Sequence, residues 1–217
     1  MKVGVDGVLL GAWAGVKEGK ILDVGTGCGL IALMLAQRFP GSEIIGIDID
    51  EASVMEAGEN FAGSPWGSKM RVILGQFPDA ISEDEKFDLI VSNPPYFRSG
   101  VDNPETSRER ARHQDSLSIF TLMKDSRKFL RKEGRLAMIF PGEFYEELIK
   151  EADNSGFSAA RVCFIRNNER RPYKRVMTEL IIDRKGDRVK AEMLTLFRGG
   201  EATEEYKKLC GEFYLNL

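Results

Sequence analysis

The amino-acid sequence predicts an α/β fold in which a mostly parallel sheet carries helices on both faces. Three observations support this fold class. Short apolar runs alternate with longer segments of helix-forming residues, which is the order that places parallel strands side by side. A glycine-rich turn at residues 25–29 joins the first apolar run to the first helical segment. The 217 residues, 42% of them hydrophobic, are enough for one well-packed domain.

The first half of the chain follows this alternating order closely. Short apolar or β-branched runs indicate strands, whereas segments rich in Leu, Ala, Met and Gln indicate helices. Pro40 and Gly41 end the first helix, and Asp50 has the residue type and position of a helix cap. The predicted elements are a strand at 21–24, a helix at 30–38, a strand at 43–47, a helix at 50–61, and strands at 70–74 and 87–91.

The second half opens with a polar stretch that extends to Asp115. Beyond it the same criteria predict a helix at 117–130, a strand at 135–140, a helix at 143–154, strands at 160–165 and 176–182, and an amphipathic helix at 203–213. The chain contains no internal repeat and no low-complexity segment. We therefore expect residues 1–217 to form a single domain.

Composition excludes several classes of protein. The longest apolar run, residues 30–36, is far shorter than the roughly 20 residues of a membrane-spanning helix. Glycine and aspartate interrupt the apolar N-terminal stretch, so we do not expect a signal peptide. The cysteines form no Cys-x-x-Cys pair and accompany one histidine, so we expect reduced thiols in a cytoplasmic protein, with no metal site; these residues are Cys28, Cys163, Cys210 and His113.

The charge is distributed unevenly along the chain. Residues 1–97 carry 7 Lys and Arg against 14 Asp and Glu, a net charge of −7. Residues 98–217 carry 24 against 20, a net charge of +4. We expect the two halves to face different partners.

The glycine turn has the spacing of a cofactor-binding loop. Gly25, Gly27 and Gly29 form a G-x-G-x-G pattern, and Leu30 breaks the G-x-G-x-x-G pattern of dinucleotide-binding proteins. With Asp23 two residues upstream, the pattern resembles motif I of class I S-adenosylmethionine-dependent methyltransferases. Glycines let the backbone approach a ligand without intervening Cβ atoms. The alternative is a tight strand-to-helix turn that binds nothing.

Three further residues follow the next two strands. Asp48 ends the second strand, where a carboxylate can accept hydrogen bonds from both hydroxyls of a ribose. Gln76 follows the third strand, where the methyltransferase resemblance implies an acid that accepts from the adenine amine; a glutamine oxygen can accept the same bond. Phe77 is a candidate for packing on the adenine, and an ordinary core role is an equal alternative.

The segment Asn93-Pro94-Pro95-Tyr96 directly follows the strand at 87–91. It resembles motif IV of methyltransferases that alkylate planar NH2 groups. The lone pair of such a nitrogen is delocalised, so the group must be positioned rather than deprotonated. We expect the Asn93 side-chain oxygen and the Pro94 carbonyl to accept its two N–H groups, and Tyr96 to stack on the base. The alternative is a proline-stiffened turn with an exposed aromatic residue.

The tetrapeptide alone leaves the substrate open, because enzymes that methylate release-factor glutamines share it. Together with the segment at 1–13, the run Arg110-Ala111-Arg112-His113 and the final 213–215, it resembles the bacterial tRNA1(Val) (adenine-37 N6)-methyltransferase family. The resemblance implies a Rossmann-like, mostly parallel seven-stranded sheet with a reversed last strand. It also implies S-adenosyl-L-methionine as cofactor and tRNA as substrate. An rRNA base methyltransferase, a protein glutamine methyltransferase and a non-catalytic nucleotide-binding module remain alternatives.

Basic residues in the second half are candidates for RNA binding. Residues 98–200 carry 22 Lys and Arg against 16 Asp and Glu, and half of one ten-residue segment is basic. A solvated loop is the alternative for that segment. We expect residues 1–97 to bind the cofactor and 98–217 the RNA, without a metal or an obligate protein partner. The candidates are Arg108, Arg110, Arg112, Arg166, Arg170, Arg171, Lys174 and Arg175.

Overall fold

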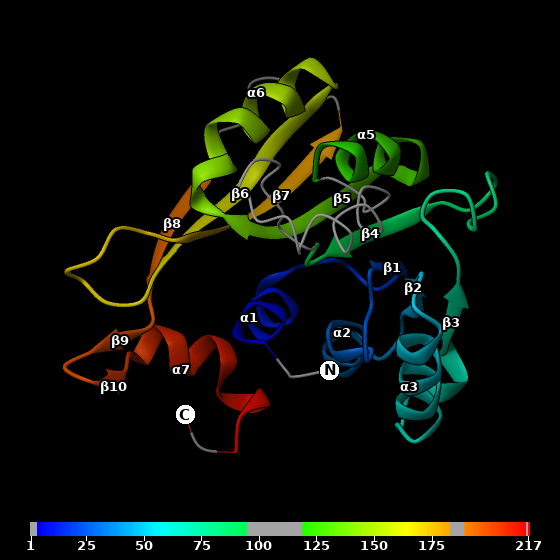
Figure 1. Ribbon diagram of the computed structural model, residues 1–217, viewed down its shortest axis with the longest axis horizontal. Coiled ribbons are helices and arrows are strands. Elements are labelled where there is room, and N and C mark those ends of the chain that lie inside the picture. The colour runs from blue at the N-terminus through cyan, green and yellow to red at the C-terminus, as the bar shows by residue number, and fades with distance from the viewer. Residues whose placement is uncertain (1–3, 95–118, 183–188, 216) are drawn as a thin grey trace, which may run out of the picture.

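The computed structural model describes residues 4–94, 119–182, 189–215 and 217. Its centre is an eight-stranded sheet with the order β3-β2-β1-β4-β5-β7-β6-β8 (Figure 1). Strand β7 runs antiparallel to both neighbours, and all other pairs are parallel. The strands are β1 (Lys20–Val24), β2 (Glu43–Asp48), β3 (Met70–Leu74), β4 (Phe87–Ser92), β5 (Leu130–Pro141), β6 (Phe157–Arg166), β7 (Arg175–Ile182) and β8 (Lys190–Thr195).

The predicted fold class is confirmed, and the predicted strand arrangement needs one correction. The sheet has eight strands instead of seven, and the reversed strand β7 is followed by β8, which pairs in parallel with the outer side of β6. The residues of β8, Lys-Ala-Glu-Met-Leu-Thr, include five good helix formers, and only Leu194 is buried. The residues of β8 locally favour a helix, and pairing with β6 overrides this preference.

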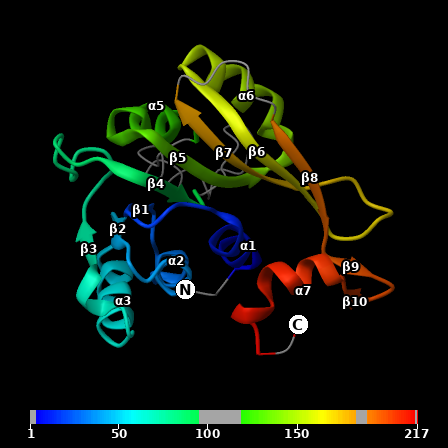
Figure 2. The ribbon, with the colours of Figure 1, turned by 180° about the vertical axis from the view of Figure 1, so that it is seen from behind.

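Helices cover both faces of the sheet, as Figure 2 shows from behind. Alternate strand residues face opposite sides: Ile21 packs into one core cluster and Leu22 into the other. The first cluster holds the buried faces of α1 (Val5–Trp13), α2 (Leu30–Arg38), α3 (Glu51–Ala62) and α7 (Glu204–Cys210). The second holds α5 (Ile119–Phe129) and α6 (Tyr145–Asn154).

Helix α1 was not predicted from the sequence. Residues 7–13 are all buried, and Gly11 lets α1 approach α2 so closely that a Cβ there would lie 2.8 Å from the Met34 sulfur. The Arg38 guanidinium of α2 donates to the carbonyls of Gly11 (2.8 Å) and Ala14 (2.5 Å). These contacts satisfy carbonyl groups at the C-terminal end of α1. They stabilise a helix that its glycines would otherwise disfavour.

The remaining elements are short. The predicted helix at 203–213 divides into α7 and a 3-10 turn, Gly211–Phe213, and Thr203 caps α7 with its side chain. Before it, β9 (Phe197–Arg198) and β10 (Glu201–Ala202) form a small hairpin. Further 3-10 turns lie at Gly67–Lys69 and Gly142–Phe144. None of the helices in the described ranges is long and apolar enough to cross a membrane.

We name the two edges of the sheet by the parallel strands: the carboxyl edge, where β1, β2 and β4 end, and the amino edge, where they begin. A buried ion-pair network lies between the middle of β7 and the end of α1. Glu179 of β7, fully buried, accepts from Arg135 (2.7 Å), Arg161 (3.1 Å) and the Gly15 backbone N–H (2.8 Å). This network joins the end of α1 to the sheet.

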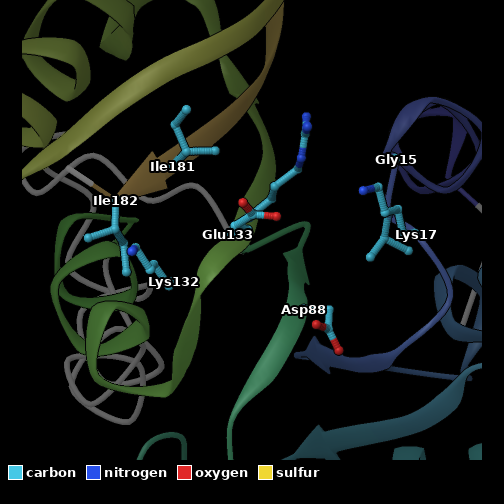
Figure 3. A pocket seen from close by; sticks show the side chains of 9 residues that line it. Gly15, Lys17, Asp88, Lys132, Glu133, Ile181 and Ile182 are labelled. Carbon is cyan, nitrogen blue, oxygen red and sulfur yellow. The ribbon is translucent and has the colours of Figure 1, made fainter. Parts of the chain in front are cut away.

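A cavity of about 450 Å³ opens at the amino edge (Figure 3). The glycine turn, which follows β1, lies at the carboxyl edge. Lys17, Lys132 and Arg135 contribute positive charge to its walls, and Asp88 and Glu133 contribute negative charge. Asp88 also accepts from the Lys20 N–H (2.7 Å) and the Arg131 guanidinium (2.8 Å). The charges of this cavity are therefore largely balanced.

Candidate active site

The glycine loop lies at the carboxyl edge between β1 and α2. Gly25, Gly27 and Gly29 have φ values of +71°, +56° and +83°, a region that residues with a Cβ rarely adopt. A Cβ on Gly29 would lie 2.5 Å from the Phe61 ring, so this glycine is needed for packing against α3. Gly25 instead faces open space, which leaves room for a ligand against its backbone.

Asp23 holds the glycine loop from below. Its carboxyl group is fully buried, and one oxygen accepts from the Thr26 hydroxyl (2.7 Å) and the Ala32 N–H (3.2 Å). The other oxygen is buried and has no hydrogen-bond partner in the described part of the chain. Burial raises the pKa of the Asp23 carboxyl to about 7. These contacts make Asp23 a positioning residue of the loop.

Asp48 lies where the sequence predicts it, at the end of β2 beside the glycine loop. One carboxylate oxygen accepts from the Gly27 N–H (2.8 Å) and the other from the Asp50 N–H (3.0 Å). Each oxygen retains a further lone pair, so the half-buried carboxylate can hold the loop and still accept from a ligand. Asp50 caps α3 as predicted, accepting from the Ser53 N–H (2.9 Å).

Two apolar side chains near Asp48 were not predicted as site residues. Ile49, the next residue, is 64% exposed, and Leu74, which pairs with Asp48 across β2 and β3, is 51% exposed. Both leave apolar surface accessible beside the Asp48 carboxylate. The sequence indicates only that these residues are apolar and lie at strand ends, and the structure shows that their side chains are exposed.

Gln76 and Phe77 differ in their surroundings. Gln76 is exposed at the carboxyl edge, two residues after β3, where its side chain is accessible to a ligand. Phe77 is 3% exposed, and its ring lies 5.5 Å from that of Phe129 in the core. This burial favours the core role for Phe77 over packing on an adenine.

Asn93 and Pro94 follow β4 at the point where the strand order of the sheet reverses. The chain builds β2 and β3 on one side of β1, and β4 and β5 on the other. Ligands of such sheets bind at this switch point. Ser92 fixes the junction, because its hydroxyl donates to the Val24 carbonyl (2.7 Å) at the start of the glycine loop. Asn93 is half-buried and Pro94 is buried, whereas Pro95 and Tyr96 lie outside the described residues.

The predicted RNA-binding residues fall into three groups. Arg108, Arg110 and Arg112 lie outside the described residues. Arg166 and Arg175 are half-buried and contact neighbouring side chains, Thr195 (2.8 Å) and Asp6 (2.5 Å) respectively. The exposed group, on the loop between β6 and β7 at the carboxyl edge, consists of Arg170, Arg171 and Lys174.

Comparison with known proteins identifies the family. Residues 7–155, from α1 to the end of α6, match the family model of the methyltransferase small domain. A relative from Bacteroides thetaiotaomicron, a tRNA1(Val) (adenine(37)-N6)-methyltransferase, is 42% identical over this whole chain and 92% of its own length. Relatives with the same name from Parabacteroides distasonis and Photobacterium profundum are 42% and 34% identical over the same shares. The chain belongs to the tRNA1(Val) (adenine(37)-N6)-methyltransferase family.

Solved structures agree with this family in fold. A predicted O-methyltransferase from Agrobacterium tumefaciens matches with a TM-score of 0.71 and 18% identity, over 95% of this chain and 96% of that one. A glycopeptide N-methyltransferase crystallised with S-adenosyl-L-methionine matches with a TM-score of 0.59 and 12% identity, over 82% and 94%. Within the described ranges, no group of three or more His, Cys, Asp or Glu side chains is placed to hold a metal.

Proposed function

We propose that this protein transfers a methyl group from S-adenosyl-L-methionine to N6 of an adenine in tRNA, adenine-37 of valine tRNA. The observation that carries the proposal is the position of Asn93. It follows β4 at the switch point of the sheet, and the preceding residue, Ser92, is hydrogen-bonded to the residue before the glycine loop. The activity in the names of the full-length relatives supports the same substrate.

The residues at the carboxyl edge fit this cofactor. Gly25 presents backbone with no atom near the position of a Cβ, and Asp48 has free lone pairs for the ribose hydroxyls. Ile49 and Leu74 offer exposed apolar surface for the adenine, and Gln76 an accessible amide. When bound, the cofactor supplies an electrophilic methyl group on a sulfonium.

The acceptor nitrogen is held by two oxygens of this chain. The Asn93 side-chain oxygen and the Pro94 carbonyl each accept one N–H of the amine, which orients its lone pair toward the methyl group. These bonds strengthen as the nitrogen becomes tetrahedral, so they stabilise the transition state more than the ground state. The amine sheds its proton after transfer, and no strong base is required. Tyr96 stacks on the extruded base.

The division of labour follows the charge of the two halves. Residues 1–97 hold the cofactor and the acceptor amine, whereas residues 98–217 hold the RNA through local positive charge. Both halves contribute strands to one sheet, so the two sites share a rigid frame. A tRNA substrate implies that the protein acts in the cytoplasm.

A methyl-transfer assay with radiolabelled cofactor tests the proposal. Total tRNA, rRNA and release factor are offered separately, and the labelled nucleoside or amino acid is identified after digestion. We expect label in tRNA, as N6-methyladenosine. Label in rRNA or in a release-factor glutamine would replace this function with one of the two alternatives, and cofactor binding without transfer to any substrate would indicate a non-catalytic module.

A further inference from the structure

The loop that joins Arg166, the last residue of β6, to Arg175, the first of β7, projects from the carboxyl edge (Figures 1 and 2). A cavity lies on this loop. The cavity has a volume of about 300 Å³. Its lining is polar and basic, with a single proline, and consists of Asn167, Asn168, Arg171, Pro172 and Lys174. No residue of the cofactor site contributes to it.

The backbone of this loop is held in place at both ends and in the middle. The Asn168 side-chain oxygen accepts from the Arg170 N–H (3.1 Å), and its carbonyl accepts from the Arg171 N–H (3.2 Å). The Lys174 N–H donates to the Ile165 carbonyl (2.9 Å), and the Lys174 carbonyl accepts from the Gly142 N–H (2.9 Å). The Tyr173 ring packs 4.8 Å from that of Phe164. A ligand therefore meets a preformed cavity and not a chain that must be ordered.

The charge of the loop is positive and unbalanced. Glu169 is its one acidic residue, and Arg198 of β9 pairs with that carboxylate at 2.6 Å. In the ranges that the structure describes, Arg170, Arg171 and Lys174 have no carboxylate within salt-bridge distance. Arg171 and Lys174 line the cavity, and the nearby Glu169 carboxylate pairs with Arg198 instead. This arrangement favours the binding of an anion in the cavity.

The amides complete the donor set. Because the Asn168 side-chain oxygen is occupied by the Arg170 N–H, its NH2 group is the end left to donate. Asn167 is exposed on the same wall of the cavity. Cationic and amide donors around one small volume are the groups that hold phosphate oxygens.

We propose that this cavity is a subsite for one backbone phosphate of the RNA, with Arg171 and Lys174 supplying the charge. The inference rests on the proposed function, which makes RNA the source of the phosphate. Strand β6 is three strand spacings from β4, each about 4.8 Å, so the loop begins roughly 14 Å from β4, the strand that Asn93 follows. The phosphate therefore belongs to a nucleotide a few positions from the target base. Arg166 and Arg175, which contact Thr195 and Asp6, support the two ends of the loop.

The salt dependence of tRNA binding tests the subsite. In R171A/K174A the slope of log affinity against log salt should decrease by roughly 0.7–0.9, since the variant loses the contact with one phosphate. Affinity should fall by the same factor for every tRNA. The charge-preserving R171K/K174R should keep the slope. The matched control, K17A/K132A, removes two positive charges at the cavity of the amino edge and should behave as wild type.

Thermal melting and cofactor affinity of R171A/K174A establish that the variant is folded. A full wild-type slope in that folded variant would overturn the proposal, as would an equal loss of slope in K17A/K132A. A titration with inorganic phosphate separates the two sources of the anion: phosphate binding lost in R171A/K174A with an unchanged tRNA slope would also overturn the RNA assignment. If wild type binds tRNA without methylating it, the proposed function fails while the slope comparison still decides the subsite.

Discussion

Two regions of the same sheet treat charge in opposite ways. Glu179 in the middle of β7 and Asp88 at the amino edge are each matched to basic groups and backbone N–H groups. At the carboxyl edge, one oxygen of Asp23 is buried without a partner among the described residues, and Arg171 and Lys174 face a cavity. Balanced charges fix the fold, and unbalanced charges at the ends of parallel strands indicate ligands. This contrast predicts which substitutions affect stability and which affect activity.

The largest expected effect is at the carboxyl edge. Asn93→Ala removes an acceptor that acts mainly in the transition state, so transfer should fall by roughly 10²–10³-fold, or about 3–4 kcal/mol. Cofactor affinity should remain nearly unchanged, because Asn93 contacts the amine. Single-turnover methylation and calorimetry measure the two quantities. Near-normal methyl transfer by the variant would contradict the proposed role of Asn93 as an acceptor for the amine.

Substitution in the buried network at Glu179 should lower stability. Glu179→Ala leaves two arginines and the Gly15 N–H without their acceptor, which should cost about 3 kcal/mol of unfolding free energy. Urea unfolding measures this cost. Arg131→Ala is the control, because its pair with Asp88 is at the surface and should contribute below about 1 kcal/mol. Equal losses of unfolding free energy in the two variants would contradict the claim that the buried network at Glu179 stabilises the fold more than a surface ion pair does.

The buried Asp23 carboxyl should make stability depend on pH. Burial raises its pKa from 3.8 to about 7, so between these values the folded protein keeps a proton that the unfolded chain has lost. Folding stability should therefore fall by a few kcal/mol as pH rises through this window, and stay level above it. Urea unfolding of wild type and Asp23→Asn across the window isolates the effect. Parallel pH profiles for the two proteins would exclude it.

The smallest of these effects is expected at Asp48. Asp48→Ala removes a charged acceptor from the proposed ribose site, and cofactor affinity should fall by about 2 kcal/mol. Asp50→Ala, which removes the α3 cap but leaves Asp48 in place, is the control for indirect effects. Calorimetry gives both affinities. An unchanged affinity in a folded Asp48→Ala would rule out the ribose contact.

The sequence predicts most of the fold because local signals and sheet order agree in the first half. The strand-glycine-helix pattern and the Asp50 cap lie where they were expected. Helix α1 was missed because its glycines obscure a helix that depends on contacts with Met34 and Arg38. Strand β8 was missed because its residues favour a helix and only pairing with β6 makes it a strand.

The candidate site was predictable where residue type determines the chemistry. Asp48 and Asn93 lie at the carboxyl edge as spacing and strand order predict. The basic cluster of residues 166–175 was predictable only as a group, because nothing in its sequence shows that Arg166 and Arg175 contact Thr195 and Asp6 while Arg171 and Lys174 face a cavity. Ion-pair partners such as Asp6 and Arg198 are distant along the chain, so these distinctions require the structure.

One measurement tests the central claim most directly. Two transcripts of valine tRNA, one with adenine and one with guanine at position 37, are incubated with the protein and cofactor, digested to nucleosides and analysed by mass spectrometry. Methylation of the adenine-37 transcript to N6-methyladenosine, with no methylated nucleoside from the guanine-37 transcript, is the predicted result. Equal methyl incorporation into both transcripts, or a product other than N6-methyladenosine, would contradict the assignment of the carboxyl edge to this reaction.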